Sequence, residues 1–224
     1  MRDLETLKRQ QEALARRVRL EPLSHEPETI GGADVSYSRS LRRLVASVVV
    51  LRWPSLEPVE EAFVEAPVTF PYVPTFLSFR ELPALLQALE RLKRRPDLLL
   101  VDGQGIAHPR RLGIAAHLGV VADLPTIGVA KHRLVGEYEE PAPEAGSATP
   151  LYLEGEQVGW VVRTRTGVKP VFVSPGHRVT LADSLRWVLA TCRGYRLPEP
   201  IRRADHRSRM RVRKRREADP TLWR

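Results

Sequence analysis

Cysteine is almost absent from this chain, because Cys192 is the single one among 224 residues. One cysteine cannot form an internal disulfide or a cysteine-rich zinc site, and its rarity is typical of a reducing compartment, so we expect a cytoplasmic protein. The sequence also has no apolar run of the length that a membrane span needs, and charged residues occur throughout its first twenty positions. We therefore expect neither a signal peptide nor a membrane anchor.

Acidic side chains are outnumbered, since 27 Asp and Glu residues stand against 36 Lys and Arg residues and give a formal net charge of +9. This excess favours an anionic partner, with nucleic acid as the first candidate and an anionic membrane surface as the rival. Nine of the basic residues lie between Ile201 and Arg216. We expect one domain over residues 1–200 and a basic, flexible tail over 201–224, which either contacts phosphate non-specifically or is simply solvated.

The pattern of apolar residues predicts an α/β fold built on a mixed sheet. Early strand-like runs with short connections, typical of antiparallel pairing, lie at 29–37, 43–53 and 58–66. They are followed by a βαβ pattern, which implies parallel pairing, with strands at 98–102 and 126–130 and a helix at 111–118. Other expected elements are an amphipathic helix from Leu4 to Val18, a hairpin at 158–165 and 170–174, and a helix at 181–192. The sequence thus predicts antiparallel strands followed by parallel strands, flanked by helices.

The centre of this pattern is the apolar run 98–101, which ends abruptly in Asp102. A continuous apolar run is typical of a strand buried on both faces, and open α/β sheets bind ligands at the carboxyl ends of such strands. Asp102 and Gly103 alone would also fit an ordinary turn. However, His108, Arg110 and Arg111 follow closely, so an acid, an imidazole and two guanidinium groups leave one strand end together, and we expect a functional site there.

Two further acids occupy positions that suggest a metal site. Asp34 lies within the first predicted strand, and Glu81 lies at the start of the predicted helix that follows residue 76. A buried unpaired carboxylate is costly, so Asp34 must face water, pair with a cation or bind a metal. If Asp34, Glu81 and Asp102 converge, they repel one another unless a hard divalent cation neutralises them. Mg²⁺, with Mn²⁺ as a substitute, is the ion that prefers such oxygen ligands, and it serves phosphodiester chemistry.

The loop before that helix is stiffened by two prolines. Pro71 and Pro74 bracket Tyr72 and Val73, so the tyrosine can be held outward at little entropic cost. For Tyr72 taken alone, a simple packing turn is the favoured explanation. In a basic protein, the same tip also resembles a wedge that unstacks bases.

Taken together, these segments resemble the endonuclease V family, in one order from the first helix to Pro200. The motifs that carry the resemblance are Ala33-Asp34-Val35, Pro71-Tyr72-Val73-Pro74, Phe76-Leu77-Ser78-Phe79-Arg80-Glu81, Val101-Asp102-Gly103, His108-Pro109-Arg110-Arg111, Pro125-Thr126-Ile127-Gly128-Val129-Ala130-Lys131 and Gly176-His177-Arg178. The resemblance implies an RNase H-like fold and a Mg²⁺-dependent nuclease that recognises deoxyinosine. It also implies a nick at the second phosphodiester bond on the 3′ side of the lesion, with 3′-hydroxyl and 5′-phosphate ends.

The resemblance also assigns roles to residues. Asp34 and Asp102 would be the principal metal ligands and Glu81 would complete the acidic site, while Lys131 would hold the scissile phosphate or orient the attacking water, and His177 would lie near the metal. The strand-separating wedge would be formed by Pro71, Tyr72, Val73 and Pro74. The pocket for the flipped base would be lined by Leu77, Gly103, His108 and Gly113. Such a pocket fits the physics, because a weakly paired lesion costs less to extrude from a duplex.

Two positions depart from the family pattern. Thr75 stands where glycine is expected, so the backbone there should not adopt a positive φ freely, and the entrance of the pocket should differ. Gln104 lies between two glycines, at a variable position where we expect little consequence.

Two alternatives stay open on the sequence alone. One is an RNase H-like nuclease that acts mainly on inosine-containing RNA or on mismatched or branched DNA. The other is a nucleic-acid binder without catalysis, which the acids disfavour because they would only weaken phosphate binding in the absence of metal. We expect a monomer whose partner is inosine-containing DNA, or RNA, and not a membrane.

Overall fold

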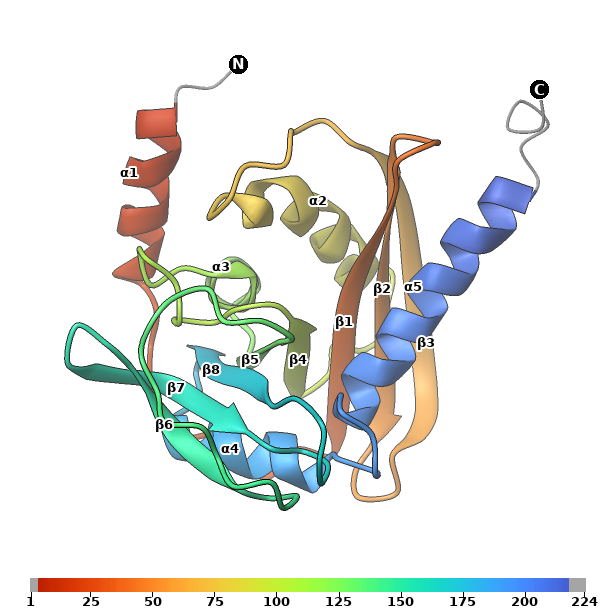
Figure 1. Cartoon of the computed structure of the whole chain (residues 1–224). Coiled ribbons are helices and arrows are strands. Elements are labelled where there is room, and N and C mark those ends of the chain that lie inside the picture. The colour runs from red at the N-terminus through yellow and green to blue at the C-terminus, as the bar shows by residue number, and fades with distance from the viewer. Residues whose placement is uncertain (1–3, 218–224) are drawn as a thin grey trace.

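The computed structural model describes residues 4–217 and contains one eight-stranded sheet with helices on both faces (Figure 1). Across the sheet the strands follow the order β3-β2-β1-β4-β5-β8-β7-β6. The strands are β1 (Thr29–Ser38), β2 (Arg43–Arg52), β3 (Glu57–Pro67), β4 (Leu98–Asp102), β5 (Thr126–Ala130), β6 (Ala148–Leu153), β7 (Glu156–Val162) and β8 (Val171–His177). The helices are α1 (Leu4–Ala15), α2 (Leu77–Glu90), α3 (Ile114–Ala122), α4 (Leu181–Ala190) and α5 (Glu199–Glu217).

The predicted change from antiparallel to parallel pairing is confirmed. β2 pairs antiparallel with β1 and β3, whereas β1, β4 and β5 run parallel to one another. The carboxyl ends of these three parallel strands therefore lie at one edge of the sheet. β8 then pairs antiparallel with β5, so the carboxyl end of β8 lies at the opposite edge.

The sheet separates two apolar cores, and β4 contributes to both. Leu99 and Val101 pack with side chains of α2 and α3 on one face. Leu98 and Leu100 pack with side chains of α4 and with Ile201 of α5 on the other. Because successive side chains of a strand alternate between its faces, a strand covered on both sides needs a continuous apolar run. This explains why the run 98–101 marks the centre of the fold.

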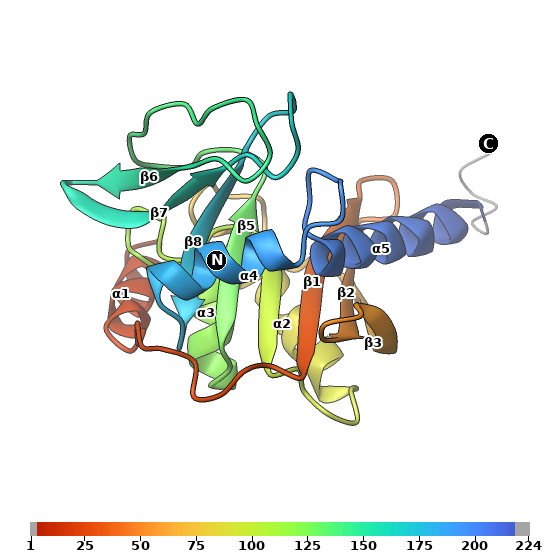
Figure 2. The same ribbon diagram turned by 90° about the horizontal axis from the view of Figure 1, so that it is seen from below.

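The C-terminal segment differs from the flexible tail predicted from residue 201. Residues 199–217 form α5, which lies against β1 and β2 (Figure 2, where α4 and α5 follow one another across the sheet). Its inward face is narrow and is made of Ile201, Ala204 and Ser208, all fully buried. The helix reaches the sheet closely because β1 has glycine at position 32, where a Cβ would lie 2.0 Å from the carbonyl oxygen of Pro200. Residues 218–224 of the predicted tail lie outside the described part of the chain.

Other elements differ from the predictions mainly at their ends. The helix predicted from residue 111 begins at Ile114, because Arg111 has a left-handed backbone (φ 54°) and Gly113 is extended. The predicted hairpin 158–165 and 170–174 is formed by β7 and β8, and β6 adds a further strand at the sheet edge. Within residues 4–217, no helix is long and apolar enough to cross a membrane.

Candidate active site

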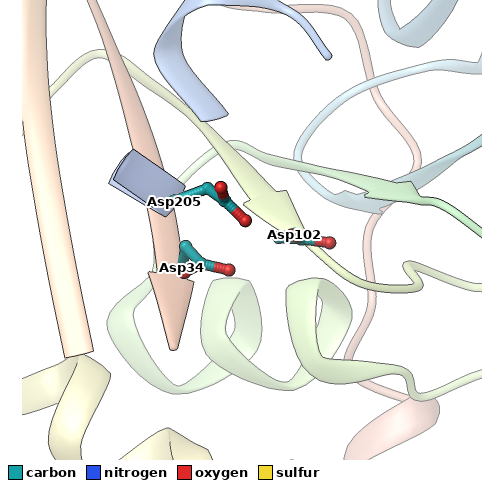
Figure 3. A group of neighbouring side chains, drawn as sticks. All are labelled: Asp34, Asp102 and Asp205. Atoms are coloured by element: carbon teal, nitrogen blue, oxygen red, sulfur yellow. The ribbon is translucent and has the colours of Figure 1, made fainter. Parts of the chain in front are cut away.

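Three carboxylates from three different elements meet at the edge of the sheet where the parallel strands end. Asp34 lies on β1, Asp102 ends β4, and Asp205 projects from α5 (Figure 3). Each offers one oxygen, and these oxygens all lie within 4.8 Å of one another. The predicted convergence of Asp34 and Asp102 is therefore observed, with Asp205 as a third member that our sequence interpretation missed.

A signal for Asp205 is present in the sequence. It is the only acidic residue between Glu199 and Glu217, in a segment rich in arginine. It also lies four residues after the buried Ile201 and three before the buried Ser208, so a helical interpretation of this segment would have turned its carboxylate toward the sheet. A flexible tail has no fixed face, so the prediction of a tail over 201–224 did not place Asp205 near the sheet.

Lys131 supplies the cation of the cluster. It follows β5 directly, and its Nζ donates to Asp102 Oδ2 at 2.5 Å and to Asp205 Oδ1 at 3.3 Å. Burial on its own would lower the pKa of Lys131, but the carboxylates of Asp102, Asp205 and Asp34 together outweigh burial, and the pKa is raised. Lys131 therefore stays charged, and one ammonium group faces three carboxyl groups.

Asp34 is the most deeply buried member, with 7% of its surface exposed. Its Oδ2 accepts a hydrogen bond from Ser208 Oγ at 2.5 Å, which joins β1 to α5 directly. Burial, followed by the charge of Asp102, raises the pKa of Asp34 to about 7. The carboxyl group is therefore poised between its neutral and charged forms near neutral pH.

Glu81, on the second turn of α2, lies within electrostatic reach of the same acids but outside the group of three. Burial, followed by the charge of Asp34, raises its pKa to about 8. A half-buried glutamate with a raised pKa can exchange a proton near neutral pH. The structure thus brings Glu81 to the acidic cluster without making it one of the three closest ligands.

The donor set fits a hard divalent cation. Three carboxylates and one lysine leave an excess of negative charge, and oxygen atoms are the ligands that Mg²⁺ and Mn²⁺ prefer. The same mutual repulsion that raises the pKa of Asp34 would be relieved by a bound cation.

A pH dependence of metal binding follows from these pKa shifts. A cation held by the three aspartates must displace the proton of Asp34, whose pKa is about 7, so we expect Mn²⁺ to bind about tenfold more tightly at pH 8 than at pH 6. The stability of the metal-free protein should change in the opposite direction. The folded-state pKa values of Asp34 and Glu81 are both raised, so the folded state keeps protons that the unfolded chain loses, and stability falls as the pH rises from about 4 to 8.

Calorimetric titration at the two pH values measures both the affinity and the protons released. Thermal unfolding adds an independent readout, since Mn²⁺ should raise the Tm more at pH 8 than at pH 6. Equal affinities without proton release would contradict the proposed protonation of the site.

The prediction that His177 lies near the metal site is wrong. His177 ends β8 and pairs with Thr126, at the amino end of β5, whereas Asp102 pairs with Val129 near the other end. Its Nδ1 accepts from the backbone N–H of Arg19, and its Nε2 lies 3.4 Å from Asp123. The antiparallel direction of β8 therefore places His177 at the edge of the sheet opposite the acids, where it fixes the chain that follows α1.

A pocket of about 420 Å³ adjoins the acidic cluster. Asp102 and Lys131 form part of its wall, and the remaining lining comes from the loops around β4, β5 and the start of α2. The predicted base-pocket residues all belong to this lining, which includes Leu77, Gly103, His108 and Gly113, together with Tyr72, Pro74, Thr75 and Gln104. The structure thus brings the four predicted pocket residues and two of the four wedge residues to one cavity beside the carboxylates.

His108 is held as a neutral imidazole of one tautomer. Its Nδ1 accepts from the backbone N–H of Arg110 at 3.2 Å, so its Nε2 carries the proton and donates to the carbonyl of Thr75 at 3.0 Å. Burial lowers its pKa to about 4. Both ring nitrogens therefore already have partners, and His108 offers the pocket a ring surface instead of a free hydrogen-bonding group.

The wedge loop has the outward tyrosine that its prolines predict. Tyr72 is 66% exposed and Pro71 and Pro74 flank it at the surface. Thr75, however, adopts the positive φ that we expected it to avoid, at 67°. A non-glycine residue in this region costs about 1–3 kcal/mol and persists only when its surroundings hold it.

Gln104 joins the loops that follow β4 and β5, because its Nε2 donates to the carbonyl of His132.

Comparison with known proteins identifies the family. The family model of endonuclease V matches residues 12–206. An endonuclease V from Geotalea uraniireducens (strain Rf4) is 55% identical over 203 residues, which cover 91% of this chain and 86% of the relative. The chain belongs to the endonuclease V family. Endonuclease V from Streptomyces avermitilis has the same fold, with 45% identity, a TM-score of 0.88 and coverage of 94% of this chain and 93% of that one.

Family membership confirms three predictions made from the sequence. The fold is the RNase H-like fold of endonuclease V structures, and the protein is a metal-dependent endonuclease of deoxyinosine repair. A further solved structure, endonuclease V from Ciona intestinalis, contains a 24mer DNA with an inosine followed by a ribo-adenosine. That protein is 30% identical, with a TM-score of 0.82 and coverage of 94% of this chain and 98% of that one.

Proposed function

We propose that this endonuclease V extrudes deoxyinosine into the 420 Å³ pocket and hydrolyses the second phosphodiester bond on the 3′ side, leaving 3′-hydroxyl and 5′-phosphate ends. The observation that carries this proposal is the shared wall of the pocket, because Asp102 and Lys131 belong both to it and to the carboxylate cluster. A base held in the pocket therefore brings its own strand to the acids.

Asp34, Asp102 and Asp205 would hold the divalent cation, for which we favour Mg²⁺ with Mn²⁺ as a substitute. When bound, the cation supplies Lewis-acid polarisation of the phosphoryl group and positive charge near the leaving oxygen. Glu81 completes the acidic site as a group that exchanges a proton near neutral pH. Lys131 holds the scissile phosphate or orients the attacking water, since a charged amine beside the acids is correctly placed for either role.

Replacement of Lys131 should lower the rate more than the affinity. We expect Lys131→Ala to reduce the single-turnover nicking rate at saturating protein about 100-fold, because the lysine acts on charge that develops in the transition state. Its Kd for a deoxyinosine duplex, measured by fluorescence anisotropy in chelator, should change by less than about threefold. Lys93→Ala, an exposed lysine elsewhere on the surface, serves as the control. Comparable single-turnover rates for wild type and Lys131→Ala would contradict this role.

Replacement of Tyr72 should lower the affinity for the lesion more than the nicking rate. Pro71 to Pro74 act as the wedge, in which the exposed ring of Tyr72 takes the place of the extruded base in the stack. We expect Tyr72→Ala to weaken binding of the deoxyinosine duplex about tenfold, on the basis of base–aromatic stacking, and Tyr72→Phe to retain it. Tyr152→Ala removes another exposed tyrosine from the edge strand β6 and should have no effect. Unchanged affinity of Tyr72→Ala would mean that the ring packs on the protein alone.

The Ciona complex directs attention to a second substrate, since its DNA carries a ribo-adenosine after the inosine. Three labelled duplexes separate the candidates: inosine followed by deoxyadenosine, inosine followed by riboadenosine, and an undamaged duplex. We expect nicking of the first at a rate within about tenfold of the second, whereas a nuclease directed mainly at RNA would cleave only the second. Loss of preference for inosine would instead favour a nuclease for mismatched or branched DNA.

The same proposal describes a monomer in the cytoplasm, where Cys192 stays a thiol.

A further inference from the structure

The wedge ends in a tight turn whose sequence disagrees with its backbone. The N–H of Phe76 donates to the carbonyl of Val73 at 3.0 Å, which closes a four-residue turn with Pro74 and Thr75 at its centre. Thr75, the third residue of the turn, has a φ of 67°. Proline at the second position and a positive φ at the third are the features of a type II turn, which normally needs glycine at the third position. A β-branched residue there must be held by something else.

Three side chains hold the carbonyl of Thr75. Its oxygen accepts from Gln11 Nε2 at 2.8 Å, from His108 Nε2 at 3.0 Å and from Arg110 Nη2 at 3.2 Å. The Thr75 hydroxyl accepts a further hydrogen bond from Arg110 Nη2 at 2.6 Å. The donors come from α1 and from the loop after β4, so two segments distant in the sequence converge on one peptide group.

The donors also support one another. Arg110 Nε donates to Gln11 Oε1, and the Arg110 guanidinium lies 4.6 Å from the centroid of the Phe76 ring. The amide of Gln11 thus donates to Thr75 and accepts from Arg110, and the residue is completely buried although α1 is otherwise largely exposed. In Figure 1, α1 stands beside the loop that leads into α2. A buried polar side chain with both ends satisfied fixes the positions of its partners.

We propose that Gln11, His108 and Arg110 form a lock that keeps Thr75 in its left-handed conformation and thereby positions the wedge over the base pocket. This inference rests on the proposed function, because it assigns positioning residues to the same lesion site. Thr75 joins the wedge tip at Tyr72 to Leu77 in the pocket wall. If its φ reverted to the negative values that threonine prefers, Tyr72 and Pro74 would move relative to the pocket.

The size of the effect follows from the population of the binding-competent turn. Without the lock, a threonine occupies the left-handed region rarely, so the apparent Kd for the lesion should rise about tenfold. A glycine at position 75 occupies positive and negative φ almost equally, and its Kd should then rise only about twofold when the lock is removed. The lock and the residue that it holds should therefore be strongly coupled.

A double-mutant cycle tests this coupling, with wild type, Gln11→Ala, Thr75→Gly and the double variant. The Kd for a deoxyinosine duplex is measured by anisotropy in chelator, and an undamaged duplex is measured in parallel. A 2-aminopurine next to the inosine reports unstacking by the wedge. Gln10→Ala provides a matched control, since it removes the same side chain from the exposed neighbouring position of α1.

We expect Gln11→Ala to raise the Kd about tenfold with threonine at position 75 and about twofold with glycine. The 2-aminopurine fluorescence should fall in Gln11→Ala and recover in the double variant with Thr75→Gly. The saturated single-turnover rate should stay within about threefold of wild type, because the carboxylates are untouched. An equal increase in Kd in both backgrounds would overturn the lock, since it would mean that Gln11 supports folding only. An unchanged Kd would overturn it as well. Failure of the proposed function is distinguishable, because wild type would then bind inosine and undamaged duplexes equally.

Discussion

Asp102→Asn and Asp34→Asn should each reduce nicking of a deoxyinosine duplex by at least about 1,000-fold while leaving lesion binding within about threefold of wild type. Both side chains belong to the carboxylate cluster, and Asp102 is also the contact of Lys131. Removal of either carboxylate weakens the cation site and, for Asp102, leaves Lys131 with Asp205 as its charged partner. Base recognition depends on the wedge and on the shape of the pocket, and Asp102→Asn keeps the shape of the one pocket-wall residue that these changes affect. The two quantities therefore separate in single-turnover rates with Mg²⁺ and in anisotropy with chelator.

The matched control lies at the opposite edge of the sheet. Asp123→Asn removes a carboxylate that pairs with Arg19 and Arg178 and that contacts His177, and it should nick as wild type does. Thermal unfolding of each variant checks that a loss of nicking is not caused by a folding defect. The check matters most for Asp34→Asn, because the Asp34 carboxyl group is buried and its raised pKa shows that its charged form is unfavourable in the folded protein. Nicking by Asp102→Asn at the wild-type rate would contradict the assignment of the site.

Asp205→Asn should reduce nicking about 100-fold and should shift the metal dependence to higher Mg²⁺ concentration. Asp205 is one of the three converging carboxylates and accepts a hydrogen bond from Lys131, so its loss removes a ligand charge and loosens the lysine. The rate is measured under single-turnover conditions over a range of Mg²⁺ concentrations.

His206→Ala is the control for this prediction, because it changes the next residue of α5, which is exposed. It tests whether disturbance of the helix alone accounts for the loss. If Asp205→Asn showed the wild-type rate at low Mg²⁺, α5 would be a covering element without a part in the site.

The sheet is predictable from the sequence because its central strands are dictated by burial. Leu98 to Val101 must be apolar on both faces, and the Asp102 that ends the run is set at the ligand-binding edge by the direction of β4. Both features depend on local pattern and on the geometry of parallel strands. Local pattern is therefore enough to place Asp102 at the ligand-binding edge, whereas the places of Asp34 and Lys131 beside it were expected from the resemblance to endonuclease V.

The remaining features of the site depend on contacts distant in the sequence. The burial of α5 rests on three small inward positions and on the glycine of β1 that admits Pro200, so composition alone suggested a tail. The position of His177 depends on the direction of β8, which a hairpin pattern with uncertain partners does not specify. The turn at Thr75 is set by Gln11 and Arg110, against the local preference of threonine.

The catalytic role of the carboxylate cluster is tested most simply by nicking of a duplex that carries one deoxyinosine, with Mg²⁺ and with chelator, beside an undamaged duplex of the same sequence. Labels on both ends of the inosine strand locate the cut. We predict one Mg²⁺-dependent nick at the second phosphodiester bond on the 3′ side of inosine, and none in the undamaged duplex. Tight binding of the inosine duplex without a nick in either Mg²⁺ or Mn²⁺ would contradict it, because the carboxylate cluster would then have no catalytic role.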